Sequence, residues 1–261
     1  MKHFCHKICL VVLACFSYLS ASAYDFEADG LYFTITSLKD LTVSVDGAVN
    51  KDTDKIVIPQ TVAYKNKSLT VTSVGDNAFK GYKNLQSVSF PKTVLSIGNS
   101  AFEKDSLLTG VVLPDSLLEI ESKAFQGCTS LKTIRIPEKV VDLNDNVFWG
   151  CRSLESIKIP SNVTKIGYSA FHDCKSLRAI YVYAEKVPIL PYNSCAFEGC
   201  DSKKCKVYVP IGTYDAYSRS QFGYFENIVE FDASSFRNTI ATAENQDTTH
   251  YVVNDKEEHT H

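Results

Sequence analysis

The chain has 261 residues, of which 44% are hydrophobic and 22% charged, so it contains enough apolar residues for a sizeable core. Basic and acidic residues number 27 and 30, and between residues 24 and 231 they nearly balance at 23 and 24. This near-neutral body excludes the basic footprint that nucleic-acid binding needs.

The first 23 residues have the pattern of a secretory signal peptide. Lys2 and Lys7 precede a mostly apolar run, and an A-x-A cleavage site ends at residue 23. The run is shorter than the roughly 20 residues of a membrane-spanning helix, and no later segment comes close. We therefore expect an exported protein with no transmembrane span. In an alternative interpretation Cys15 ends a lipoprotein cleavage box, which would leave this cysteine lipidated and the protein anchored to a membrane.

Residues 24–58 are expected to form an N-terminal β cap. Residues 31–36 and 41–45 alternate like two strands, and Ser37–Asp40 between them has the composition of a turn. The Ile-Val-Ile phrase at 56–58 begins the first coil of a repeat, and an insertion follows it before Val74.

A repeat of 23 residues occupies the middle of the chain. Its unit reads P-x-x-V-x-x-I-x-x-x-A-F-x-x-C-x-x-L-x-x-I-x-I. A period of 20–29 residues with an L-x-x-I-x-I phrase is typical of leucine-rich repeats, with one short strand and a turn or 3₁₀ segment per coil. We therefore predict a β-rich solenoid over residues 59–231. The phenylalanines predicted to form its core recur at steps of 23, with a last step of 26: Phe79, Phe102, Phe125, Phe148, Phe171 and Phe197.

Repetition of the unit allows the chain to bury its apolar side chains. The last two apolar residues of L-x-x-I-x-I are two apart, so they point to the same side of a strand. One coil cannot close around its own apolar side chains, but coils stacked at roughly 4.8 Å bury them in continuous columns. The proline after each strand phrase lacks an N–H group and marks the place where the chain turns.

The end of the repeat is expected to close the core with a strand-helix cap. Residues 206–210 form a last strand phrase, a short helix follows at 214–220, and Phe222, Tyr224 and Phe225 cover the open end. Residues 232–261 are polar, acidic and without a period, so we expect them to be disordered or to serve as a tether.

Three stretches resemble the BspA-like leucine-rich-repeat family of bacterial surface proteins. They are the units ending in AF-x-x-C, the stretch VTSVGDNAF at 71–79, and the stretch KVYVPIGTYDAYSRSQFGYFENIVEF at 206–231. The chain departs from the family at Phe222, where a Trp is often found, and at Asp105, which replaces a Cys. The resemblance implies a secreted or cell-surface protein, and for some relatives binding to host extracellular proteins or to other bacteria.

Six cysteines follow the signal sequence, and four occupy the Cys position of the repeat. A ladder spreads its side chains along an axis, whereas a metal site converges them on one point, so a column of buried apolar thiols is predicted and a metal site is not. In an oxidising compartment Cys195 or Cys200 pairing with Cys205 remains an alternative. The six are Cys128, Cys151, Cys174, Cys195, Cys200 and Cys205.

The sequence gives no support for an enzyme or a cofactor. No G-x-S-x-G, HExxH or phosphate-binding glycine loop is present. His172 lies in a column that also holds Lys, Glu, Gln and Trp in other coils, which is typical of a solvent-facing position. Trp149 of the same column is either an exposed aromatic or a side chain tucked inward.

The variable residues of the strand phrases are the candidate ligand-binding surface. They project from one side of the solenoid in columns, which become basic and aromatic toward the C-terminus. We hypothesise a secreted or surface adhesion module that binds a protein, such as a host extracellular-matrix protein, or a glycan. Two alternatives stay open: solvated positions simply favour Lys and Arg, and the protein is a periplasmic structural or inhibitory partner of another bacterial protein. The hypothetical site comprises Lys132, Arg135, Lys158, Arg178, Tyr181 and Tyr183.

Overall fold

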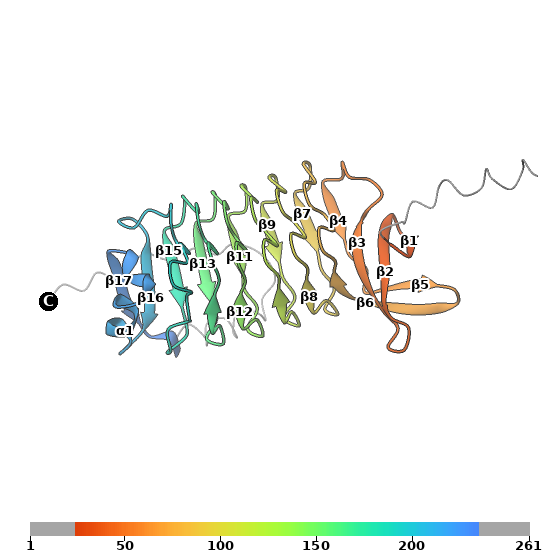
Figure 1. Cartoon of the computed structure of the whole chain (residues 1–261). Coiled ribbons are helices and arrows are strands. Elements are labelled where there is room, and N and C mark those ends of the chain that lie inside the picture. Colours follow the sequence, from red (N-terminus) through yellow and green to blue (C-terminus); the bar gives the residue numbers. More distant parts are fainter. Residues whose placement is uncertain (1–23, 235–261) are drawn as a thin grey trace, which may run out of the picture.

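The structure is a computed structural model that describes residues 24–234. The predicted signal peptide, with Cys15, and the predicted disorder of residues 235–261 lie outside the described residues. Figure 1 shows coils stacked side by side along one axis, with a cap at each end. The predicted β-rich solenoid with 23-residue coils is confirmed.

One wall of the solenoid is a parallel sheet of eight strands, called here the main sheet. Each strand pairs in register with the strand of the preceding coil, and in every strand except β17 the second residue is buried. From the N-terminal end the strands are β4 (Lys55–Val57), β7 (Ser87–Ser89), β9 (Gly110–Val112), β11 (Thr133–Arg135), β13 (Ser156–Ile159), β15 (Ala179–Val182), β16 (Lys206–Pro210) and β17 (Asn227–Phe231).

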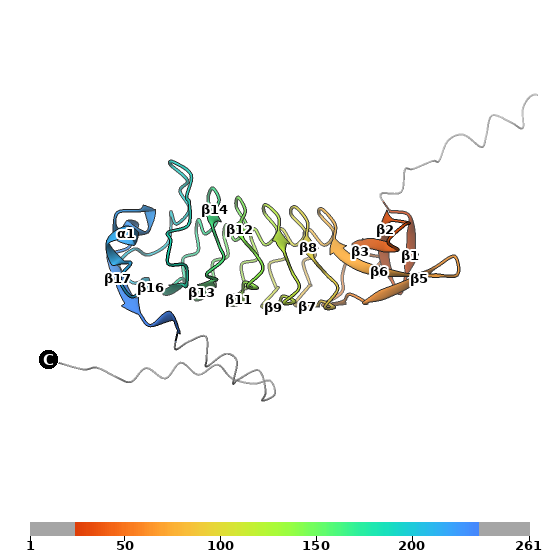
Figure 2. The ribbon, with the colours of Figure 1, turned by 90° about the horizontal axis from the view of Figure 1, so that it is seen from below.

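The opposite wall also contains strands, which the prediction of one strand per coil missed. Figure 2 shows them across the coil from the main sheet. They arise at the V-x-x-I phrase, where a buried Ile or Leu points inward and the backbones of successive coils pair in parallel. These strands are β8 (Ser96–Ile97), β10 (Glu119–Ile120), β12 (Asp142–Leu143) and β14 (Lys165–Ile166).

The N-terminal cap covers the first coil with a small antiparallel sheet. The predicted turn joins two of its strands, and the Ser37 hydroxyl there donates to the Asp40 carboxylate at 2.8 Å. The predicted insertion is a hairpin that projects beyond the stacked coils (Figure 1). The strands are β1 (Phe26–Ala28), β2 (Leu31–Ser37), β3 (Thr42–Ala48), β5 (Thr61–Tyr64) and β6 (Lys67–Val74), and β3 pairs with β6 in parallel.

The C-terminal cap contains the short helix α1 (Tyr214–Ser218), the 3₁₀ helix η1 (Gln221–Tyr224) and β17. Phe222 and Phe225 close the core as predicted, with ring centroids 5.1 and 5.2 Å from that of Phe197. Tyr224 does not, because its side chain is exposed and its hydroxyl donates to the Cys200 carbonyl at 2.9 Å. The strand β17 was not predicted, since its sequence lacks the repeat phrase.

The six repeat phenylalanines form one uninterrupted stack through the solenoid. Neighbouring ring centroids are 5.4–5.8 Å apart and neighbouring ring planes differ by 5–18°. Five of the six are completely buried, and Phe197 is 3% exposed. These are favourable offset-stacked aromatic geometries, so each ring is stabilised by burial and by both neighbours.

A column of cysteines runs beside the ring stack, as predicted. Each thiol donates to the carbonyl of a phenylalanine in the preceding coil, for example Cys151 Sγ to Phe125 O at 3.2 Å. Burial raises the pKa of these thiols, that of Cys200 to about 12. No disulfide forms within residues 24–234, so the alternative pairing with Cys205 is not observed.

Asp105 stands in this column where the four following coils have Cys. Its carboxyl group is completely buried, and Oδ1 accepts a hydrogen bond from the backbone N–H of Tyr82 at 2.8 Å. The other oxygen, Oδ2, has no hydrogen-bond partner. Burial therefore raises the pKa of Asp105 to about 8. The fold accommodates Asp in place of Cys at this position. Because burial disfavours the charged form, the carboxyl group of Asp105 favours its protonated, neutral form.

Removal of one ring from the stack tests its contribution. Phe125→Ala is expected to lower the free energy of unfolding by about 3–5 kcal/mol, because it leaves a cavity between two rings. Lys132→Ala, on the exposed surface of the same coil, should change it by less than about 0.5 kcal/mol. Urea denaturation measures both, and equal effects would contradict a core built on the stack.

Thiol alkylation tests the cysteine column. In the native protein Cys195 is exposed and should react with iodoacetamide, whereas the other five thiols of residues 24–234 are buried and should be protected. All six should react after unfolding without reductant. Mass spectrometry of the peptides measures the labelling. If Cys200 or Cys205 reacted after unfolding only once reductant was added, the pair would be a disulfide.

The buried carboxyl of Asp105 makes stability depend on pH. The pKa is about 8 in the folded chain and roughly 3.9 when unfolded, so the folded state binds an extra proton between these values and loses stability as pH rises. Asp105→Cys removes this loss. We expect the substitution to raise the free energy of unfolding more at about pH 8 than at about pH 5. An equal gain in urea denaturation at both pH values would show that the carboxyl is not protonated in the fold.

Candidate functional site

The outer face of the main sheet carries a register-aligned row of side chains, called here the outer column. It runs across β11, β13, β15, β16 and β17, because each member pairs directly with the next in the neighbouring strand. In the first four strands each member alternates with buried residues of its strand, so it faces away from the core; in β17 the residue before it is only partly buried. The outer column consists of Arg135, Lys158, Tyr181, Tyr208 and Val229.

The basic end of the outer column is oriented by an ion pair. Arg135 Nη1 lies 2.6 Å from Asp115 Oδ1, and both side chains are largely exposed. An exposed pair of this kind contributes little to stability but fixes the direction of the guanidinium group. Lys158 is half-buried, and this burial, with the positive charge of Arg135 as a second cause, lowers its pKa.

The other end of the outer column is aromatic. The rings of Tyr181 and Tyr208 stack with centroids 4.6 Å apart and planes 9° apart. Phe231 lies edge-on to them, at 6.3 Å from Tyr181 and 6.4 Å from Tyr208. Sequence reasoning missed Tyr208 and Phe231 because both belong to the cap, although the KVYV phrase aligns Tyr208 with Tyr181. The result is a rigid aromatic platform beside two cations.

Two further predicted residues lie in the adjacent row. Lys132 and Arg178 are exposed and occupy alternate coils, with Glu155 between them: Glu155 N donates to Lys132 O at 3.0 Å, and Arg178 N to Glu155 O at 2.8 Å. The row therefore alternates in charge, with an acidic residue between two basic ones. The structure therefore aligns three of the six predicted residues, Arg135, Lys158 and Tyr181, in one row, whereas Lys132 and Arg178 precede their strands and Arg178 Nη1 donates to the Leu177 carbonyl at 3.0 Å.

Tyr183 differs from the prediction, because it is only 7% exposed. It stands where the preceding coils have the strand-ending proline, such as Pro160, and its ring lies 5.4 Å from the ring of Phe231, edge to face. Phe231, which packs against it, belongs to β17 and lies 48 positions later in the chain, so the repeat pattern contained no sign of this contact. Tyr183 therefore packs against one ring of the aromatic platform.

Trp149 and His172 form a separate pair at the corners of adjacent coils. Trp149 is 39% exposed, which excludes the inward-tucked interpretation, and its ring meets the imidazole edge-on at 5.7 Å. His172 Nδ1 lies 3.9 Å from Glu198 Oε2. Both follow the stacked phenylalanine of their coil and not a strand of the main sheet, so they lie outside the outer column.

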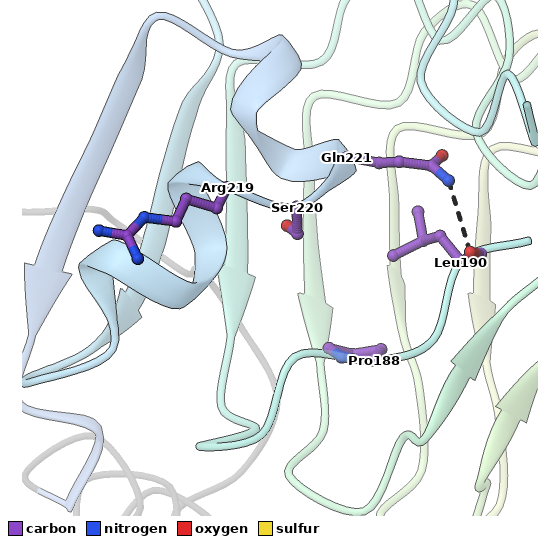
Figure 3. Close-up of a pocket in the computed structure, with 5 residues that line it drawn as sticks. All are labelled: Pro188, Leu190, Arg219, Ser220 and Gln221. Atoms are coloured by element: carbon purple, nitrogen blue, oxygen red, sulfur yellow. Dashed lines mark hydrogen bonds between the residues drawn. The ribbon is translucent and has the colours of Figure 1, made fainter. Parts of the chain in front are cut away.

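A shallow hollow of about 420 Å³ lies between the loop before the last coil and the cap. Pro188 and Leu190 form one side, and residues 219–221 the other. Figure 3 shows the Arg219 side chain directed away from Gln221, whose side chain spans the hollow and donates to the Leu190 carbonyl at 3.4 Å. The hollow is open, and its one charged side chain is exposed, so it lacks the convergent polar groups of a ligand pocket.

Neither a metal-binding cluster nor a membrane-spanning helix is found in residues 24–234. No group of three or more His, Cys, Asp or Glu side chains is arranged to hold a metal ion. None of the helices in this part of the chain has the length and apolar character needed to cross a bilayer.

Solved structures of bacterial proteins resemble this chain. A leucine-rich-repeat protein of T. pallidum is 26% identical, with a TM-score of 0.58, over 78% of this chain and 98% of the other. A leucine rich cell surface protein of Faecalibacterium prausnitzii A2-165 is also 26% identical, with a TM-score of 0.43, over 62% of this chain. The chain spans 55% of the length of that protein. A leucine-rich-repeat protein of Bacteroides ovatus is 22% identical, with a TM-score of 0.43, over 80% of this chain and 77% of the other.

A family model gives the more direct evidence. The model of the BspA type leucine rich repeat region matches residues 56–178 and 145–245, with six copies. No curated protein matches the sequence. The matched residues include every coil of the ring stack, from Phe79 to Phe197. The chain therefore belongs to the BspA-type leucine-rich-repeat family.

Proposed function

We propose that the protein is an exported binding module that recognises a protein or a glycan through the outer column. The observation that carries this proposal is the aligned row of two cations and two stacked tyrosines on an otherwise regular sheet. Solenoids of this family are typically non-catalytic binding scaffolds. Arg and Tyr are also the residues most often found at the energetic centres of interfaces.

The shape of the outer column favours an elongated ligand. Its five members span four strand-to-strand steps, or roughly 19 Å, and the row runs perpendicular to the strands. This length matches about six residues of an extended peptide, or a short run of sugar units. The tyrosine faces offer stacking area to either ligand, while Arg135 and Lys158 favour a ligand with acidic groups at one end.

The proposed location is outside the cytoplasm. The signal-peptide pattern of residues 1–23 supports export, and the F. prausnitzii protein that the chain resembles is described as a cell surface protein. In this proposal residues 24–58 and the cap up to residue 231 protect the ends of the solenoid, and residues 232–261 are separate from it. Lipidation at Cys15 would keep the binding face at the membrane.

Paired variants test the binding face. Lys158→Ala combined with Tyr181→Ala should weaken capture of ligands from host extracellular matrix or bacterial lysate by at least about tenfold, because both side chains are central to the outer column. The matched control is Lys165→Ala with Tyr168→Ala, which removes the same residue types from the opposite wall. Thermal melting checks that both variants are folded. Equal capture by the two variants would place binding elsewhere.

Protease treatment of intact cells, combined with the capture experiment, distinguishes the proposed location from its alternative. A surface module is degraded by protease added to intact cells, whereas a periplasmic partner of another bacterial protein is protected. Protection of the protein, with capture only from bacterial lysate, would replace surface recognition by the periplasmic alternative.

A further inference from the structure

We infer that the hairpin of β5 and β6 in the N-terminal cap is a docking surface for a second copy of the chain. The outer edge of β5 in one copy pairs antiparallel with the same edge in the other, so that the two hairpins join into one continuous sheet. This contact does not involve the outer column, so it goes beyond the proposed function and stands or fails independently of it.

The outer edge of β5 is open, because within residues 24–234 this strand pairs only with β6. Val71 N donates to Gln60 O at 3.0 Å, so this pair is hydrogen-bonded and the pairs that follow it alternate. The backbone groups of Thr61 and Ala63 therefore point away from β6, and both residues are exposed. Thr70, opposite Thr61, agrees with this alternation, since its N–H donates at 2.8 Å to the residue just before β3.

β5 also lacks the protection that the other edge strands have. An exposed sheet edge is a template for another strand, and proteins usually block it with a charged residue, a proline or a bulge. β5 reads Thr-Val-Ala-Tyr and pairs with β6 without a register shift. Each of the other edge strands in the described sheets contains a charged residue, namely Glu27 in β1, Lys55 in β4, Glu119 in β10, Asp142 in β12, Lys165 in β14 and Glu230 in β17.

The hairpin is placed where a second copy can reach it. Figures 1 and 2 both show it projecting beyond the stacked coils at the N-terminal end. The two solenoids of a pair would therefore extend away from the shared sheet.

A second copy matches the open edge residue by residue. With a two-fold axis at Val62, Thr61 of each copy lies opposite Ala63 of the other, and both outward-facing residues form hydrogen-bonded pairs. A shift of this register toward the base of the hairpin would place Ala63 opposite Pro59, which has no N–H group. A shift toward the tip would place Thr61 opposite Lys65, which belongs to the turn and has a φ of 44°.

The charges of the hairpin favour the antiparallel arrangement. Lys65 lies at the tip, with its ammonium group 4.9 Å from the centre of the Tyr64 ring. In the antiparallel pair the tips point in opposite directions, and the two copies of Lys65 are about 20 Å apart. This distance exceeds the Debye length of about 8 Å at physiological salt, so the repulsion between the tips is screened. A parallel pair would place the same lysines side by side.

Sedimentation equilibrium tests the association. β5 has four residues, whereas a stable interface buries roughly 800 Å² on each partner, so we expect a weak and reversible dimer. Between about 10 µM and about 1 mM protein the mean mass should rise toward twice that of the monomer. A mass that stays at that of the monomer over the whole range would overturn the inference.

Proline substitutions locate the contact. Ala63→Pro removes an outward-facing N–H group and should weaken association by at least about tenfold. The matched control is Ser68→Pro, which should associate like the unaltered protein. Ser68 pairs with Ala63 and is also exposed, but its N–H group points to the opposite edge of the hairpin. Thermal melting checks that both variants fold. Equal association of the two variants would place the contact elsewhere and overturn the inference.

Amide hydrogen exchange gives a second measurement, on the unaltered protein. The N–H groups of Thr61 and Ala63 should exchange several-fold more slowly at high than at low protein concentration, because they are bonded only in the dimer. Those of Val62 and Tyr64 bond within the hairpin and should change little. Exchange at Thr61 and Ala63 that does not depend on concentration would overturn the inference. None of these measurements involves an external ligand, so their failure is distinguishable from failure of the capture experiment.

Discussion

The contact between one phenylalanine ring and the next is the interaction on which the rest of the structure depends. A single coil is too small to surround its own apolar side chains, and the ring stack supplies each coil with neighbours on both sides. Ring spacings of 5.4–5.8 Å are close to the spacing of strands in a sheet, so the stack and the backbone pairing of the main sheet reinforce each other. Caps are needed because the stack has two ends. Phe222 and Phe225 close the C-terminal end by packing against Phe197.

The backbone conformation of the coils also repeats, like the residues of the core. In every coil of the stack a residue in the left-handed conformation, with φ of 49–62°, precedes the stacked Phe by two positions, and none of these residues is a glycine. The last coil is longer by three residues, yet Cys195 keeps this conformation, so the extra length is confined to the loop of residues 184–193. That loop lines the hollow of Figure 3, which is therefore a consequence of the insertion.

The 23-residue period carried most of the predictions that the structure confirms. The period of Phe79 and its successors identified the solenoid, its core and the buried thiols. The strands at the V-x-x-I phrase were missed because two paired residues are too short for an alternating pattern. The burial of Tyr183 and the stacking of Tyr208 on Tyr181 depend on β17, a strand outside the repeat. Contacts between a repeat and its cap have no period, so no pattern within the repeat revealed them.

The composition of the outer column does not follow from the requirements of folding. Its N-terminal continuation holds Val112, Ser89 and Val57, of which the two valines are 85% and 58% exposed, while the inward-facing residues of the same strands are all Val or Ile. Exposed positions of the coils are free to vary, because substitutions there usually change stability by less than about 0.5 kcal/mol. The aromatic residues of the column pack against Phe231 of the cap, whereas the change from Val112 to Arg135 and Lys158 is not imposed by the packing of the core. We propose that these cations reflect what the face contacts.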